Sequence, residues 1–330
     1  MGRARFLLVR TLQTVFMLWF ALTFIFFFFR LLPGSFTDIM MFRGASPETI
    51  AAFEQKWGLN DPLHIQYVRY MRNFLVGDVG MSLQFRQPVW DFVKMKIFNS
   101  FILVAPAITV TYIIGSLIGG YLGEKRGQAI EKYGLPPIVF SGAFPEFFIA
   151  IVLIIVFAGW LNLFPTSGMF GFQSAGRFAD APWWRPYLTA DFAHHYILPF
   201  TAVVFRYLYL PVLIMRTSVV EVLGQDFFFY HRMTGIPGGN RMRHLLKHAS
   251  LPVITLYPVS MTRAIGGLVL IEIVFNWPGI GYALVQGVLS RDFPVVQFVF
   301  FLVAAFVIIA NFGVDVIYGI IDPRVSVGDD

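Results

Sequence analysis

The chain has 330 residues, of which 57% are hydrophobic and only 13% are charged, whereas soluble domains carry about 25% charged residues. This composition excludes a water-soluble globule and a disordered chain, and the absence of Cys excludes disulfide scaffolds, thiolate metal sites and cysteine nucleophiles. The formal net charge of +6 suits anionic lipid, so we expect an integral membrane protein that binds membrane lipid and no nucleic acid.

The apolar stretches define the expected transmembrane helices. A bilayer-spanning helix needs about 20 mostly apolar residues, and six stretches meet this requirement. In chain order they cover residues 11–29, 97–123, 135–161, 196–220, 251–275 and 293–320. The first stretch is followed by Arg30, Pro33 and Gly34 rather than by a small-residue cleavage site, so we expect it to remain as an anchor. The sequence therefore predicts an all-α membrane protein with six spans.

Residues 31–96 are too long for a plain connection between the first two spans. Ser46 followed by Pro47 is typical of a helix start, and Gly58 is typical of a helix end. A second helix is expected from Pro62 to about Leu75. We therefore expect a small folded insertion on the outer side. The predicted organisation is 1–30 (cytoplasmic N-terminus and first span), 31–96 (extracytoplasmic insertion), 97–320 (the other spans, with a cytoplasmic loop at 221–250) and 321–330 (cytoplasmic tail).

Basic residues in the short segments predict the orientation. They occur in the N-terminal segment, after the second span and after the fourth span, which share one side of the membrane if six helices alternate. Short basic segments stay in the cytoplasm, so we expect both termini there and the chain in the cytoplasmic membrane. The basic residues used here are Arg3, Arg5, Arg10, Lys125, Arg126, Lys132, Arg232, Arg241, Arg243 and Lys247.

Signals for enzyme chemistry are weak. The chain contains no Gly-Lys pair, which a phosphate-binding loop requires. His244 and His248 have the spacing of helical metal ligands, but Lys247 and the basic surroundings favour a solvated helix face. The His194–His195 pair is expected to be interfacial. We therefore expect no catalytic residue, metal site or cofactor in this chain, and not an enzyme.

The loop after the fourth span contains the most informative segment. Residues 225–234 are expected to form a short helix that ends at Gly235. A short aromatic helix outside the membrane favours a groove on a partner protein. The alternative is a helix that lies on the lipid surface.

At this loop the sequence resembles a known family. Glu221-Val222-Leu223-Gly224-Gln225-Asp226, with Gly235 nine residues later, is similar to the coupling loop of permeases in ATP-binding-cassette importers of the dipeptide/oligopeptide type, in the MetI-like superfamily. Ordered matches cover almost the whole chain, at residues 30–34, 58–67, 77–83, 251–252, 272–281, 291–297 and 315–324.

The resemblance implies a six-helix permease subunit with several partners. These are a second homologous permease, two ABC ATPases that bind ATP and Mg²⁺, and an extracytoplasmic solute-binding protein. It also implies that the loop couples to an ATPase, although Phe229, Tyr230 and His231 depart from the small or polar residues usual at their positions. The coupling candidates are Glu221, Gln225, Asp226, His231, Arg232 and Gly235.

Two arginines are expected near the middle of the bilayer. Arg206 and Arg263 lie ten and twelve residues inside their spans, and a charge there costs at least a few kcal/mol unless it faces water or a partner. One hypothesis is that both line the translocation cavity. The alternative is a structural pairing with Glu146 or Glu272, or with a carboxylate of the partner permease. These four residues are the pathway candidates, whereas Arg216 and Asp315 are expected to be structural anchors near the cytoplasmic end.

Three functional hypotheses follow. The resemblance favours an importer permease for short peptides, and within the same family oligosaccharides are an alternative solute. The hypothesis from a different class is a stand-alone secondary transporter. Such carriers usually have internal repeats and helices that are broken at the midplane, and the sequence indicates neither.

Overall fold

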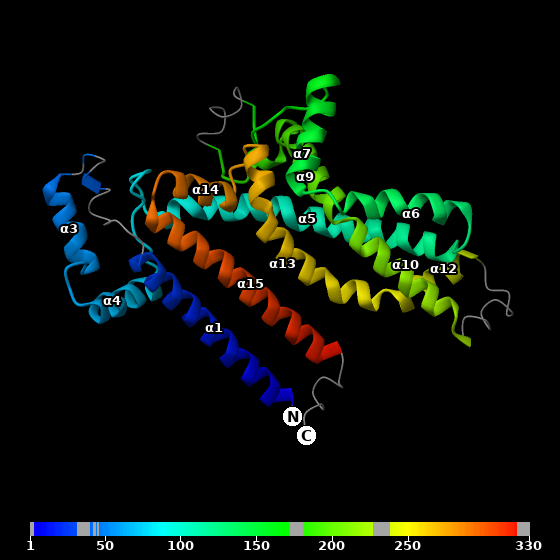
Figure 1. Cartoon of the computed structure of the whole chain (residues 1–330), viewed down its shortest axis with the longest axis horizontal. Coiled ribbons are helices and arrows are strands. Elements are labelled where there is room, and N and C mark those ends of the chain that lie inside the picture. Colours follow the sequence, from blue (N-terminus) through cyan, green and yellow to red (C-terminus); the bar gives the residue numbers. More distant parts are fainter. Residues whose placement is uncertain are drawn as a thin grey trace. The chain divides into compact units, whose positions relative to one another are not determined.

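The computed structural model describes residues 3–31, 40–41, 44, 46–171, 181–226 and 238–321. These residues form helices, and none of them belongs to a strand, so the expected all-α fold is confirmed (Figure 1). The elements are α1 (Arg3–Leu31), α3 (Pro47–Trp57), α4 (Leu63–Leu75), α5 (Val89–Glu124), α6 (Ala129–Ser141), α7 (Glu146–Leu153), the π-helix η1 (Ile154–Trp160), the 3₁₀-helix η2 (Arg185–Leu188), α9 (Ala190–Tyr207), α10 (Tyr209–Leu223), α12 (Gly238–Ala249), α13 (Leu251–Val274), α14 (Ile280–Leu289) and α15 (Phe293–Ile321).

Within the described residues, four helices are long and apolar enough to cross a membrane: α1, α5, α13 and α15. Two further candidates are bent pairs: α6 with α7 and η1, bent by 103°, and α9 with α10, bent by 40°. The expectation of one continuous helix at 135–161 and another at 196–220 is therefore wrong. The number of spans reaches six if each bent pair crosses the membrane once.

A proline follows the end of the first helix at the same distance in both bent pairs. A proline clashes with the carbonyl group four residues before it and removes a backbone donor. Pro145 stands four residues after Ser141, where α6 ends, and Pro211 stands four residues after Tyr207, where α9 ends. Both helices thus end at the residue whose carbonyl such a proline displaces.

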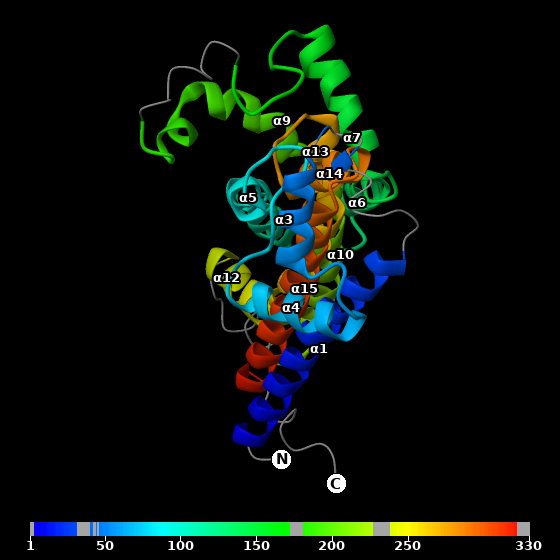
Figure 2. The same cartoon turned by 90° about the vertical axis from the view of Figure 1, so that its left-hand side faces the viewer.

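The described residues fall into two compact units, which we describe separately. Unit 1 consists of Met1–Asn99 and Gly279–Asp330. In it α1 runs along α15, and Figures 1 and 2 both show these two helices side by side. Ile25 and Phe29 of α1 pack against Val296 of α15. Arg10 pairs with Asp315 at 3.3 Å, which agrees with the anchoring role expected of Asp315.

A buried carboxylate fixes the segment before α5 within unit 1. Asp292 is 0% exposed and immediately precedes α15. The Ser82 hydroxyl donates to its Oδ2 atom at 2.5 Å, and the Gln84 backbone N–H donates to the same atom at 2.9 Å. The Leu83 N–H donates to Oδ1 at 3.2 Å. One side chain therefore binds three consecutive residues that are more than 200 positions away in the sequence.

Helices α3 and α4 agree with the sequence prediction for their region. The Ser46 hydroxyl accepts a hydrogen bond from the Thr49 N–H at 3.2 Å, and Gly58 ends α3 with a left-handed φ of 62°. Helix α4 begins directly after Pro62 and ends at Leu75. The extracytoplasmic position of this segment stays a prediction.

Unit 2 consists of Ser100–Pro278. Within it, helices α5 and α10 approach each other closely. Gly115, Gly119 and Gly123 form one ridge of α5, spaced four residues apart, as in membrane helices that pack through small residues. A Cβ atom on Gly123 would lie 2.9 Å from the carbonyl oxygen of Arg216, and one on Gly119 would collide with the carbonyl group of Val212. The glycines therefore let α10 contact α5 backbone to backbone.

An ion pair fastens α10 to α6 in the same unit. The guanidinium of Arg216 donates to Oε1 of Glu131, with Nε at 2.8 Å, and the Gly127 N–H donates to Oε2 at 2.6 Å. The Glu131 carboxylate is thus satisfied on both oxygens. This pairing agrees with the anchoring role expected of Arg216.

Candidate functional site

The two helix breaks of unit 2 meet at a polar cluster. Glu146 is the first residue of α7, just after the first break, and Tyr207 is the last residue of α9, just before the second. The Tyr207 hydroxyl donates to Oε1 of Glu146 at 3.0 Å. The Nε atom of Arg206 lies 3.9 Å from the same carboxylate oxygen. The structure thus brings together two of the four predicted pathway residues, Arg206 and Glu146.

The pairing of Arg206 with Glu146 is loose. At 3.9 Å it is longer than a charge-assisted hydrogen bond, and among the described residues the buried Nε atom of Arg206 has no hydrogen-bond partner. The guanidinium also lies 5.5 Å from the ring centre of Tyr207 and 5.8 Å from that of Tyr209, within cation–π range. Because the arginine side chain is 24% exposed and the glutamate 14%, the charges are largely but not fully enclosed. Ring contacts and a long charge–charge contact therefore hold the guanidinium, rather than a direct hydrogen bond from its Nε atom to the carboxylate.

Two glycines make room for the cluster. A Cβ atom on Gly267 of α13 would lie 2.6 Å from Oε2 of Glu146, and one on Gly142 would collide with the ring of Tyr209. Neither position can carry a larger residue without displacing the charged or aromatic group. Gly142 and Gly267 are therefore functional candidates that the sequence analysis missed, because only the tertiary contact identifies them.

The cluster lies halfway along both bent pairs. Arg206 is near the middle of the α9–α10 pair, and Glu146 is near the middle of the pair formed by α6, α7 and η1. If each pair crosses the membrane once, both charges are at the bilayer midplane, where an unpaired charge is costly. Charges at this depth characteristically line aqueous pathways or pair with each other.

The other two pathway candidates lie elsewhere in unit 2. Arg263 is exposed on α13, and no carboxylate in the described part of the chain forms an ion pair with it. Glu272 is 0% exposed and accepts a hydrogen bond of 2.5 Å from the Ser100 hydroxyl. Its backbone carbonyl accepts from the Trp277 N–H at 2.7 Å. Glu272 thus belongs to the packed interior, and the assignment of all four residues to a pathway stays a prediction.

The predicted coupling loop is described only at its edges. Glu221 is exposed in the last turn of α10, and Gln225 and Asp226 are exposed just after it. His231, Arg232, Gly235 and nearly all of the helix expected at 225–234 lie outside the described residues.

Helix α12 follows this loop, and the sequence analysis expected a helix face at His244 and His248 without giving the bounds of the helix. It buries Leu245 and Ala249, with Leu246 against the position of Gly120 on α5. It exposes a basic face that consists of Arg243, His244, Lys247 and His248. His244 and His248 are therefore on a solvated face, as expected. The spacing of Met242, Leu245, Leu246 and Ala249 is helical and could have located this helix.

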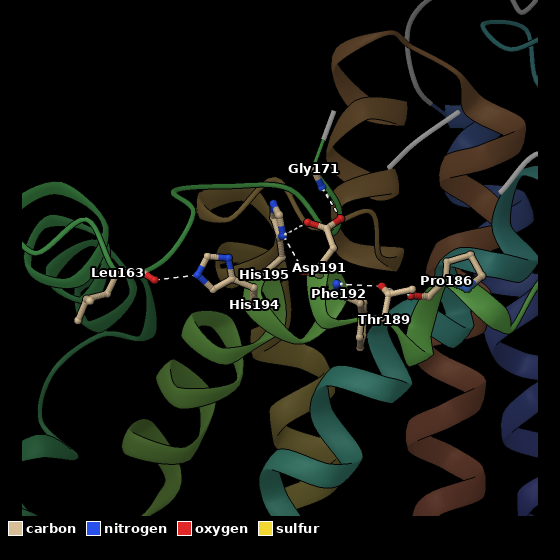
Figure 3. A network of polar contacts seen from close by, with 8 residues as sticks. All are labelled: Leu163, Gly171, Pro186, Thr189, Asp191, Phe192, His194 and His195. Atoms are coloured by element: carbon tan, nitrogen blue, oxygen red, sulfur yellow. Dashed lines mark hydrogen bonds and ion pairs between the residues drawn. The ribbon is translucent and has the colours of Figure 1, made fainter. Parts of the chain in front are cut away.

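The histidine pair on α9 belongs to a separate polar network (Figure 3). Nε2 of His194 is 2.7 Å from the Leu163 carbonyl oxygen, and Nδ1 of His195 is 2.8 Å from that of Asp191. The Asp191 carboxylate accepts from the Gly171 N–H at 2.9 Å. In the described part of the chain, no three His, Asp or Glu side chains are arranged to hold a metal. These contacts attach the segments before α9 to its first turn.

Comparison with known families defines the class of this protein. Residues 111–327 match the family described as binding-protein-dependent transport system inner membrane component, and residues 3–100 match the N-terminal region of such membrane components. The chain belongs to this family of membrane permeases, which confirms the predicted resemblance.

Individual relatives are similar over nearly their whole length. The oligopeptide transport system permease protein AppB of Bacillus subtilis is 29% identical over 326 residues, covering 98% of this chain and 99% of AppB. The dipeptide transport system permease protein DppB of Escherichia coli K12 is 31% identical over 320 residues, covering 91% and 92%. The metal-staphylopine import system permease protein CntB of Staphylococcus aureus is 30% identical over 283 residues, covering 86% and 84%. All three are named as permease proteins of transport systems.

Proposed function

We propose that this chain is the permease subunit of an ATP-driven, binding-protein-dependent importer of short peptides. The observation that carries the proposal is the similarity to AppB and DppB over more than nine-tenths of the chain. In the proposed assembly, a second homologous permease completes the pathway. Two ABC ATPases bind ATP and Mg²⁺, and an extracytoplasmic binding protein delivers the peptide.

Coupling to the ATPase is proposed for the segment that follows α10. Its residues are Glu221, Gln225, Asp226, His231, Arg232 and Gly235. Helix α10 runs about 22 Å from the break at Leu208 to Leu223, and its contacts with Gly119 and Glu131 favour movement as a rigid rod. A force applied at its exposed end would therefore reach the break beside Arg206.

The pathway is proposed to include Arg206, Arg263, Glu146 and Glu272. A peptide carries a carboxylate and an ammonium group, which are complementary in charge to Arg206 and Glu146. The loose geometry of that pair supports a role in which the two side chains release each other to contact the passing solute. Glu272 would act from the interior, where its carboxylate accepts a hydrogen bond from Ser100 of α5.

The proposed orientation places both termini in the cytoplasm and the chain in the cytoplasmic membrane, from the distribution of basic residues.

Oligosaccharide import receives no support from AppB, DppB or CntB, none of which is named for a sugar. Family membership also argues against a stand-alone carrier, even though the structure contains the broken helices expected of one. No enzymatic role is proposed for the chain itself.

The composition of the purified assembly tests this proposal. We expect the tagged chain, extracted from its native membrane in mild detergent, to co-purify with a second permease of similar length and with two ATPase subunits. Mass spectrometry identifies the subunits, and a mock purification from cells without the tag is the control. A chain that elutes alone or as a homomer and still transports solute would contradict the proposal.

A further inference from the structure

Helix α4 has two faces of different character within unit 1. One face contacts α1: the hydroxyl groups of Tyr67 and Thr23 lie 2.8 Å apart, and the rings of Tyr67 and Tyr70 lie 5.4 and 5.3 Å from that of Phe26. Burial raises the pKa of Tyr70 to about 12, and the nearby charge of Arg30 opposes that shift. Tyr70 therefore stays neutral at physiological pH.

The depth of this contact follows from the length of α1. Its uncharged stretch, residues 11–29, is about 28 Å long, which matches the hydrocarbon core of a bilayer at about 30 Å. Thr23 lies about 9 Å inside the end of this stretch and Phe27 about 3 Å inside it. Tyr67 contacts both residues. Helix α4 is thus held at the level where the acyl chains meet the headgroups.

The opposite face of α4 is apolar and uncovered by the described residues. Ile65, Val68 and Leu75 are 38%, 63% and 82% exposed. With Arg72, which is also exposed, they follow the spacing of one helix face. His64 is exposed at the edge of the same face. In water the apolar residues of this face would be unfavourable, whereas apolar residues beside a histidine and an arginine suit the bilayer interface, where the arginine can reach the phosphates.

The contact between α1 and α4 lies beside a surface that α1 must present to lipid. Phe20, Phe24 and Phe28 form an exposed stacked row on α1, with ring centres 6.5 and 6.0 Å apart. This row is the ridge next to Thr23 and Phe27, which contact α4. The lipid that covers the row at the end of α1 therefore reaches α4 as well.

We infer that α4 is an interfacial helix whose face of Ile65, Val68, Arg72 and Leu75 contacts bilayer lipid. The leaflet is the one at the C-terminal end of α1, which is the outer leaflet in the orientation proposed above. The inference does not depend on the solute or on the ATPase. It assigns α4 a second role beside its place in the outer segment, because lipid contact would fix the height of that segment above the membrane.

Site-directed spin labelling tests this inference cleanly because the chain contains no Cys. Val68→Cys and Leu75→Cys place a nitroxide on the exposed face, in the assembled importer in lipid nanodiscs. Val15→Cys, exposed in the middle of α1, is the lipid reference, and Ala51→Cys, exposed on α3, is the aqueous reference. The unsubstituted chain supplies the background signal.

The measured quantity is how often the nitroxide collides with O₂, which concentrates in lipid, relative to a nickel chelate, which stays in water. We expect this ratio to be several-fold higher at positions 68 and 75 than at position 51. A ratio equal to that at position 51 would mean that α4 lies in water, and it would overturn the inference. Labels at 68 and 75 that are shielded from both reagents would mean that another protein surface covers the face, which would overturn it equally.

Discussion

Replacing either member of the Arg206–Glu146 pair is expected to destabilise the permease, and replacing both is expected to restore stability but not transport. Arg206→Gln or Glu146→Gln leaves one charge unpaired, which at the centre of a bilayer costs about 2.5–3.5 kcal/mol on insertion scales. The double variant removes both charges and keeps a side chain that can accept the Tyr207 hydrogen bond. We therefore expect near wild-type thermal stability and strongly reduced peptide uptake from the double variant.

The controls for this prediction separate a structural role from a role in the pathway. Arg263→Gln removes an exposed charge that has no ion-pair partner in the described residues, and it should leave the melting temperature unchanged. Stability is measured by thermal unfolding of the purified complex, and uptake is measured in proteoliposomes that contain equal amounts of complex. A double variant that transports at the wild-type rate would show that the pair is only structural.

Removing the Asp292 carboxylate is expected to have the largest effect on the stability of unit 1. Asp292→Ala deprives the Ser82 hydroxyl and the N–H groups of Leu83 and Gln84 of their acceptor. The Ser82 hydroxyl is buried, Leu83 is half-buried and Gln84 is exposed. A buried donor left unsatisfied costs about 1–3 kcal/mol, so we expect a total loss of about 2–4 kcal/mol and early proteolytic cleavage near residue 83.

Asp91→Ala provides a matched control, because Asp91 pairs with Lys94 on the surface and both side chains are nearly half exposed. Exposed pairs of this kind contribute about 0–1 kcal/mol. Thermal unfolding together with limited proteolysis measures both variants. Equal behaviour of Asp292→Ala and Asp91→Ala would contradict the role assigned to Asp292.

The breaks in the bent pairs mark the limit of what the sequence could predict about the fold. Hydropathy located the apolar segments, and Ser46, Pro47 and Gly58 located α3, because these signals are local. Prolines do not distinguish a broken helix from a continuous one: Pro106, Pro199 and Pro258 lie inside helices that continue through them. At Pro145 and Pro211, tertiary contacts make the difference between a broken helix and a continuous one. One such contact is the hydrogen bond between Tyr207 and Glu146, which connects the two breaks.

The candidate site was only partly predicted, because tertiary packing brings its residues together. The cost of a charge in the membrane pointed to Arg206, and Glu146 was one of several partners considered for it. Only the packing of α7 against α9 selects Glu146, and only the packing of α13 identifies Gly267. Helix α14, at ten residues, was missed because it is too short to be recognised as a span.

The position of the cluster suggests how coupling and transport could be joined in one chain. Helix α10 begins at the break beside Arg206 and ends at Leu223, two residues after the exposed Glu221, so a displacement at one end would change the geometry at the other. The Arg206–Glu146 pair connects that break to the break between α6 and α7. Two bent helices linked by a loose ion pair form an element that could adopt two arrangements, as alternating access requires.

ATP-dependent uptake by the reconstituted importer tests the central claim most directly. The complex that contains this chain is placed in proteoliposomes with ATP inside, and its binding protein and a radiolabelled dipeptide or oligopeptide are added outside. Our account predicts accumulation that requires both ATP and the binding protein and that unlabelled peptide competes away. Uptake that proceeds without ATP, or ATP-driven uptake that only a non-peptide solute inhibits, would contradict the account.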